Sequence, residues 1–150
     1  MLKRITLMLF SIVFMTACSS DDDEIRAGRY GMMGEETPQY AAVMFMNAIY
    51  SDETLDQAVS LSTDRFSKIL LAYYTPKTVQ RQIFNLRLDS MLAEPVSGGA
   101  LLLSDAQDEA EIEIKIIGEY QKNKVTELKT LLMVKVKGNW KVAKVQNTVP

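Results

Sequence analysis

Hydrophobic positions divide the chain into an apolar run, a polar stretch and a longer patterned region. The run from Ile5 to Met15 is predominantly apolar. Residues 19–36 show no apolar periodicity and contain three glycines, which predicts a flexible acidic tether. From Thr37 onward, apolar residues follow first a helical and then a strand-like spacing. The patterned region therefore predicts a folded domain over residues 37–150.

The first half of this domain is expected to be helical. Thr37 followed by Pro38 is typical of a helix N-terminus, and the helix is expected to run to about Tyr50. This segment is apolar on most of its surface, which predicts burial on several sides. Further helices are expected near 53–60, from Ser62 onward, and from Pro76 through Gln82. The inward stripe of the third helix is expected to be Phe66, Ile69, Leu70 and Tyr73.

The second half alternates apolar and polar residues, as strands do. Strands are expected over 84–89, 100–103, 112–116, 124–137 and 140–145, with turns at 97–99, 121–123 and 138–139. In the long strand, one face carries Thr126, Leu128, Thr130, Leu132, Val134 and Val136, and the other carries Val125, Leu131 and Met133. The order predicts an α+β fold, with N-terminal helices packed on a curved antiparallel sheet of about four to five strands.

The closing hairpin carries a family resemblance. Lys137-Gly138-Asn139-Trp140-Lys141-Val142, after long strands and a helical first half, resembles the NTF2-like (cystatin-like) superfamily. That resemblance implies a sheet that wraps the first helix and leaves a pocket beside it. The expected lining is Tyr40, Met44, Met46 and Tyr73. The superfamily includes enzymes, ligand binders and assembly domains, so the fold alone does not decide the function.

The N-terminus has the pattern of an export signal. Lys3 and Arg4 precede the apolar run, which is shorter than the roughly 20 residues of a membrane-spanning helix. Met15-Thr16-Ala17-Cys18 resembles the lipobox of bacterial lipoproteins. The alternatives are an ordinary cleaved signal and a core cysteine. The resemblance implies a signal peptide over 1–17, a lipidated tether over 18–36, and diacylglycerol and N-acyl chains on Cys18.

The same resemblance predicts the location of the protein. Ser19, rather than Asp, follows the cysteine and resembles the sorting pattern for the outer membrane. We therefore expect a protein of the cell envelope, anchored by lipid in the outer membrane and facing the periplasm. Two or more acyl chains are what stable membrane anchoring requires.

The amino-acid composition limits which catalytic and metal-binding sites the protein can contain. The chain has 150 residues, a net charge of −2, one cysteine and no histidine. The absence of histidine removes the commonest general base and most zinc sites. We therefore expect no catalytic residue, no metal site and no cofactor beyond the lipid. The charge balance lacks the basic excess of a nucleic-acid binder. The lysines of the last strands, Lys135, Lys137, Lys141 and Lys144, could form a basic sheet face.

Two functions of different class fit these observations. The first is a non-catalytic protein–protein interaction module with a protein partner or a second copy, which would expose an apolar sheet patch at Val125, Leu131 and Met133. The alternative is a binder of a small apolar or amphipathic molecule in the pocket beside the first helix. An enzyme that uses Tyr and Asp side chains ranks third.

Overall fold

A computed structural model describes residues 34–102 and 108–147 of the chain. Residues Met32–Pro150 form one compact unit. Within it the elements follow the order α2 (Pro38–Ser51), α3 (Asp56–Ser60), α4 (Asp64–Leu71), α5 (Pro76–Gln82), β1 (Ser90–Leu102), β2 (Glu109–Tyr120), β3 (Asn123–Val136) and β4 (Asn139–Asn147). The fold is thus α+β, with the helices before the strands. Cys18 and the predicted signal and tether up to residue 33 lie outside the described residues.

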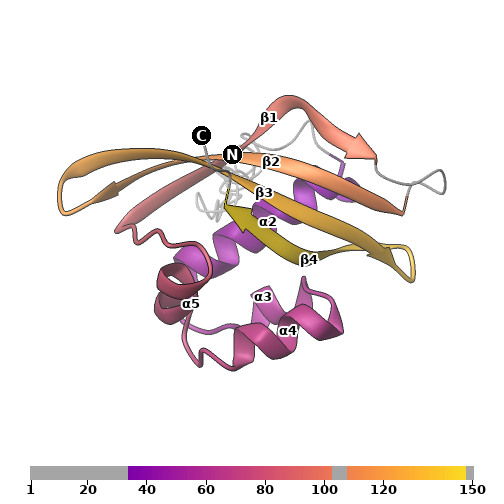
Figure 1. Cartoon of the computed structure of the whole chain (residues 1–150), viewed down its shortest axis with the longest axis horizontal. Coiled ribbons are helices and arrows are strands. Elements are labelled where there is room, and N and C mark those ends of the chain that lie inside the picture. The colour runs from indigo at the N-terminus through magenta and orange to yellow at the C-terminus, as the bar shows by residue number, and fades with distance from the viewer. Residues whose placement is uncertain (1–33, 103–107, 148–150) are drawn as a thin grey trace, which may run out of the picture. The chain divides into compact units, whose positions relative to one another are not determined.

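The four strands form one antiparallel sheet in the order β1-β2-β3-β4, as a simple meander. The helices lie on one side of the sheet, and α2 contacts all four strands (Figure 1). We call the side that faces the helices the inner face and the opposite side the outer face. No helix among the described residues is long and apolar enough to cross a membrane.

Helix α2 forms where the sequence predicts it. The Thr37 hydroxyl accepts a hydrogen bond from the Tyr40 backbone N–H at 3.3 Å, and Pro38 opens the first turn. Its buried residues come from several sides of the helix: Ala41, Ala42, Val43, Phe45, Met46, Ala48 and Ile49. The prediction of a helix buried on several sides is confirmed. The same Thr-based cap begins α4 and α5, at Thr63 and Thr75.

The core lies between α2 and the inner face of β2 and β3. Ile112, Ile114 and Ile116 of β2 are at most 1% exposed. The Phe45 ring lies 6.0 Å from Phe66 of α4 and 6.4 Å from Phe84, between centroids. These contacts join α2, α4 and the segment after α5 into one apolar cluster.

Two expectations for the segments before β1 are wrong. Residues 84–89 alternate as predicted, and Phe84 and Leu86 are buried, but the segment forms no strand. Its backbone turns instead, with Asn85 at φ 49° and the Leu86 N–H donating to the Gln80 carbonyl at 3.0 Å. Ile69, expected in the inward stripe of α4, is 43% exposed, because only Phe66 and Leu70 of this short helix reach the core.

The strands are longer than their alternation indicates. The expected break at 97–99 falls inside β1, where the pairing with β2 shifts register between Pro95 and Ala100. The β2–β3 turn uses Gln121 and Lys122, with φ 50° and 68°. The last turn uses Lys137 and Gly138, one residue earlier than expected. Positive φ at both central residues is what a tight hairpin requires.

The outer edge of β4 is covered at one point. The Thr63 N–H donates to the Val142 carbonyl at 2.9 Å, and the Val142 N–H donates to the Leu61 carbonyl at 2.8 Å. The segment between α3 and α4 thus adds a short parallel bridge, Ser62 to Val142, to the sheet edge.

Candidate functional site

The exposed large hydrophobic side chains of the described residues fall into two places. Leu128 and Val136, each 40% exposed, lie on β3, while Ile69, Leu71 and Tyr74 lie at the end of α4 and just after it. Figure 1 shows α4 on the side of the domain opposite the outer face, with α2 between them. The domain therefore presents two separate surfaces that could meet a partner.

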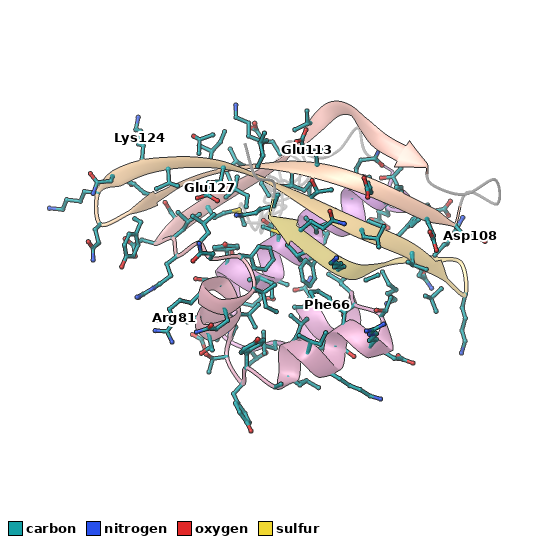
Figure 2. The ribbon with its side chains drawn as sticks, in the orientation of Figure 1. Phe66, Arg81, Asp108, Glu113, Lys124 and Glu127 are labelled. Carbon is teal, nitrogen blue, oxygen red and sulfur yellow. The ribbon has the colours of Figure 1, made fainter. Side chains whose placement is uncertain are left out.

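The register defines the outer face of the sheet. Ile112 pairs with Leu131 and Ile114 with Lys129, so the odd-numbered positions of β3 share the inner face with the isoleucines of β2. The even-numbered positions of β3 then lie outside. Figure 2 shows Glu113 and Lys124 on the outer side and Glu127 on the side of the helices.

The apolar patch expected at Val125, Leu131 and Met133 therefore lies on the inner face and is not exposed. Leu131 and Met133 are fully buried under the helices, and Val125 also belongs to the inner face. The isoleucines of β2 determine this choice, because they pair with the odd-numbered residues of β3 and bring them to the core. The outer face carries the other set: Thr126, Leu128, Thr130, Leu132, Val134 and Val136.

Acidic residues border this aliphatic stripe on β2. Glu109 pairs with Val134, Glu111 with Leu132 and Glu113 with Thr130. Directly paired residues share a face, so all three glutamates lie on the outer face beside β3.

Basic residues border the stripe on β4. Lys141 pairs with Val134 and Lys144 with Leu132. Positions three apart normally lie on opposite faces of a strand. The register shifts between these pairs, and Ala143 is the extra residue, so both lysines lie on the outer face. Lys141 also bends toward α3, where its ammonium donates to the Ser60 carbonyl.

The other two lysines of the expected basic face lie elsewhere. Lys135 is paired with Trp140 on the inner face, and its ammonium lies 5.7 Å from the centre of the Trp140 ring. Lys137 is in the β3–β4 turn. Along residues 130–134 of β3, the outer face is therefore a band of three rows: glutamates on β2, aliphatic and threonine side chains on β3, and lysines on β4. Farther along β2, Lys115 lies on the same face beside Leu128.

A polar cluster on the inner face was not expected from the sequence. Lys129, only 4% exposed, forms an ion pair with Glu127, with Nζ 2.7 Å from Oε2. The Tyr50 hydroxyl, at the end of α2, donates to the Leu86 carbonyl at 3.0 Å. Burial, and then the charge of Glu127, raise the pKa of Tyr50 well above its usual range, so its phenol stays a hydrogen-bond donor. The Tyr50 hydrogen bond thus fixes the end of α2 to the segment after α5, near the charge of Glu127 on β3.

The residues expected to line a pocket have different surroundings. Tyr40 and Met44 lie one turn apart on α2 and are half-buried, whereas Met46 is fully buried in the core. Tyr73 is half-buried in the turn after α4. A pocket with this lining stays a prediction.

Charged and metal-binding clusters are sparse in the described part of the chain. Across residues 34–102 and 108–147, no group of three or more Asp, Glu or Cys side chains is placed to hold a metal ion.

Comparison with known proteins gives only distant likenesses, among solved structures. No family model matches the chain, and no curated protein matches it. Among solved structures, the chain is similar to the intermembrane space region of the chloroplast protein ARC6, at 12% sequence identity and a TM-score of 0.42. That match covers 79% of this chain and 98% of the other.

Proposed function

We propose that the protein is an envelope lipoprotein whose NTF2-like domain is a non-catalytic protein–protein interaction module. The lipobox-like sequence ending at Cys18 supports the anchor, and Ser19 supports the outer membrane facing the periplasm. The α+β order and the closing hairpin around Trp140 support the NTF2-like assignment.

The three-row outer face is the observation that carries the proposed function. It is broad, no helix of the described residues packs on it (Figure 1), and its central strand exposes aliphatic side chains. Exposed apolar area rimmed by charge is typical of a protein interaction surface. Along residues 130–134, acidic side chains border the stripe on β2 and basic side chains border it on β4, so a partner must present the opposite order of charges.

The partner that this pattern fits best is a second copy of the chain. If two outer faces pack with a two-fold axis along β3, the aliphatic stripes meet and β2 of each copy lies over β4 of the other. Glu111 and Lys144 flank the same residue, Leu132, so the axis brings Glu111 of one copy opposite Lys144 of the next. Such an interface is isologous and closes as a dimer. Packed sheets of this kind keep their strands within about 30° of one another.

The oligomeric state of residues 32–150 tests the proposal. We expect sedimentation velocity and native mass spectrometry to give a dimer without added mass. Glu111→Lys alone and Lys144→Glu alone should each weaken the dimer, because each places like charges opposite one another. An equimolar mixture of the two variants should form heterodimers, in which both opposite-charge pairs are restored.

A charge reversal on the other side of the domain serves as control. Lys77→Glu on α5 changes the net charge as much as Lys144→Glu does and should leave the dimer intact. A monomer at all concentrations would contradict self-association, and a reproducible small-molecule adduct on that monomer would favour the pocket binder instead. Recovery of the Glu111→Lys dimer on mixing with Lys77→Glu, to the same extent as on mixing with Lys144→Glu, would show that only net charge matters.

The lipid anchor has its own test. Intact mass analysis of the full chain extracted from membranes should show the diacylglyceryl and acyl additions on a chain that begins at Cys18. Cys18→Ala should abolish these additions and release the protein from the membrane fraction. An unmodified cysteine in the membrane-extracted protein would contradict the lipoprotein assignment.

A further inference from the structure

The corner between α4 and α5 exposes three large apolar side chains in sequence proximity. Ile69 is 43%, Leu71 52% and Tyr74 87% exposed. Helix α4 uses Phe66 and Leu70 for the core, and Ile69 and Leu71 of its last turn are exposed on two different sides of the helix, next to the turn that carries Tyr74. We call this surface, with the basic residues around it, the α4–α5 corner.

The backbone holds Tyr74 in its outward position. Tyr74 has φ 64°, and its N–H donates to the Leu71 carbonyl at 3.1 Å. The Thr75 N–H then donates to the Tyr73 carbonyl at 2.7 Å, and Thr75 caps the N-terminus of α5. The turn is thus fixed on both sides by hydrogen bonds, so the most exposed aromatic side chain of the described residues stands on an ordered support.

Four exposed cations lie on α4 and α5, the two helices that flank these apolar side chains. Arg65, Lys68, Lys77 and Arg81 are all exposed, and the segment 65–82 contains no acidic residue. Within the described part of the chain, none of these four forms an ion pair. The corner therefore combines an apolar tip with positive charge, whereas the net charge of the whole chain is −2.

We infer that the α4–α5 corner docks on an anionic lipid surface. Aliphatic and aromatic side chains enter the headgroup region, while lysine and arginine side chains reach the lipid phosphates along their flexible stems. Tyrosine suits this boundary because its ring is apolar and its hydroxyl polar. Three apolar residues make a small patch for a protein partner, which normally covers about 800 Å² per side, but shallow insertion into lipid needs no such area.

The inference goes beyond the proposed function because it assigns a second membrane contact, independent of Cys18. The corner lies on the opposite side of the domain from the outer face (Figure 1). Docking on lipid therefore leaves the outer face directed away from the membrane and accessible to its partner.

Cosedimentation with vesicles tests the inference on residues 32–150, which form a compact unit with its own core and lack the acyl chains. We expect binding to vesicles that mix phosphatidylcholine with phosphatidylglycerol, little binding to phosphatidylcholine alone, and a decrease with added salt. Lys68→Glu and Lys77→Glu should each weaken binding by about fivefold or more, since each basic residue near an anionic surface contributes roughly that factor. Leu71→Ser should weaken it as well.

Lys144→Glu on the outer face is the matched control and should bind vesicles as the unchanged protein does. Tyr74→Trp should give a blue shift of the added fluorescence on anionic vesicles only. Thermal melting of each variant checks that it folds, and all the substituted side chains are exposed. Absence of binding to anionic vesicles would overturn the inference. Equal losses in Lys77→Glu and Lys144→Glu would overturn it too, because they would assign the binding to net charge rather than to the corner.

The dimer experiment and the vesicle experiment test the two surfaces independently of one another. Lys144→Glu is expected to disrupt only the dimer, and Lys77→Glu only vesicle binding. A dimer without vesicle binding contradicts the corner alone, and vesicle binding by a monomer contradicts the outer-face interface alone.

Discussion

The ammonium of Lys129 lies 2.7 Å from the carboxylate of Glu127, two positions away on the inner face of β3. The side chain of Lys129 is 6% exposed, whereas that of Glu127 is 40% exposed. A nearly buried cation is thus neutralised by a carboxylate that reaches toward solvent. Such a pair is costly to break from one side, because the remaining charge keeps its burial and loses its partner.

We therefore expect Glu127→Gln to destabilise the domain by about 1–3 kcal/mol. Urea unfolding followed by circular dichroism gives the free energy of unfolding. Glu113→Gln, on the outer face of β2, removes the same charge and should change stability little. The double variant Glu127→Leu with Lys129→Met should recover most of the loss, since it removes both charges together. A full loss in the double variant would argue against the ion pair as the cause.

Tyr50 gives the domain a pH dependence at high pH. Its pKa is raised by burial first and by the charge of Glu127 second, so the folded state holds the phenolic proton more tightly than the unfolded chain. The contribution to stability is complete below the ordinary tyrosine pKa of about 10 and is lost as the pH rises above it.

We expect the loss to approach roughly 1.4 kcal/mol per pH unit above that value for this one proton. Unfolding in urea between neutral and alkaline pH measures it. Tyr50→Phe should flatten the slope while costing the hydrogen bond to the Leu86 carbonyl. The matched substitution Tyr74→Phe, at the exposed corner, should keep the slope, and identical slopes for Tyr50→Phe and the parent chain would contradict the assignment.

Gln80 connects α5 with the last turn of α2. Its side-chain amide donates to the Ile49 carbonyl at 2.8 Å, and the residue is only 6% exposed. The last carbonyls of a helix lack partners within the helix, so Gln80 supplies one. Gln80→Leu should cost about 1–3 kcal/mol of unfolding free energy, because it leaves a buried carbonyl without its donor. Gln82→Leu, on the exposed side of the same helix, is the control and should have little effect.

Residue 118 of β2 must be glycine, because the backbone of Ser90 and the side chain of Leu88 pack closely against it. A Cβ at this position would lie 2.5 Å from the Ser90 carbonyl oxygen and 2.7 Å from Leu88 Cδ1. Since backbone is the nearest neighbour, Gly118→Ala should force β1 away from β2 and cost about 1–3 kcal/mol. Gly138, at φ +86° with open space around it, provides the contrast, because Gly138→Ala should cost about 1 kcal/mol through backbone conformation alone. Equal melting temperatures for Gly118→Ala and the parent chain would contradict the clash.

The sequence allows prediction of elements whose signals are local. Thr37 and Pro38 define the start of α2, and the alternation of Ile112, Ile114 and Ile116 identifies β2, because capping and the two-residue period depend on neighbouring positions only. Alternation alone does not require a sheet, however. Phe84 and Leu86 are buried in alternation, although residues 84–89 form no strand.

The candidate surfaces depend on relationships that the linear pattern lacks. Which side of β3 is open depends on its register with β2, and the face of Lys144 depends on the extra residue Ala143. Glu127 and Lys129 resemble solvated strand charges in the sequence, although they lie between the apolar residues Val125 and Leu131 on the same strand face. The exposure of Ile69 follows from the shortness of α4, which periodicity alone does not predict.

The interrupted edges of the sheet restrict how copies of this protein can aggregate. On β4, the backbone of Val142 is already occupied by residues 61–63, and Ala143 breaks the ladder beside it. On β1, Pro95 has no N–H to offer and the register slips after it. Neither margin gives an incoming strand a continuous template, so fibre growth by strand addition is obstructed at both ends of the sheet. The domain can therefore associate through its face without polymerising through its edges.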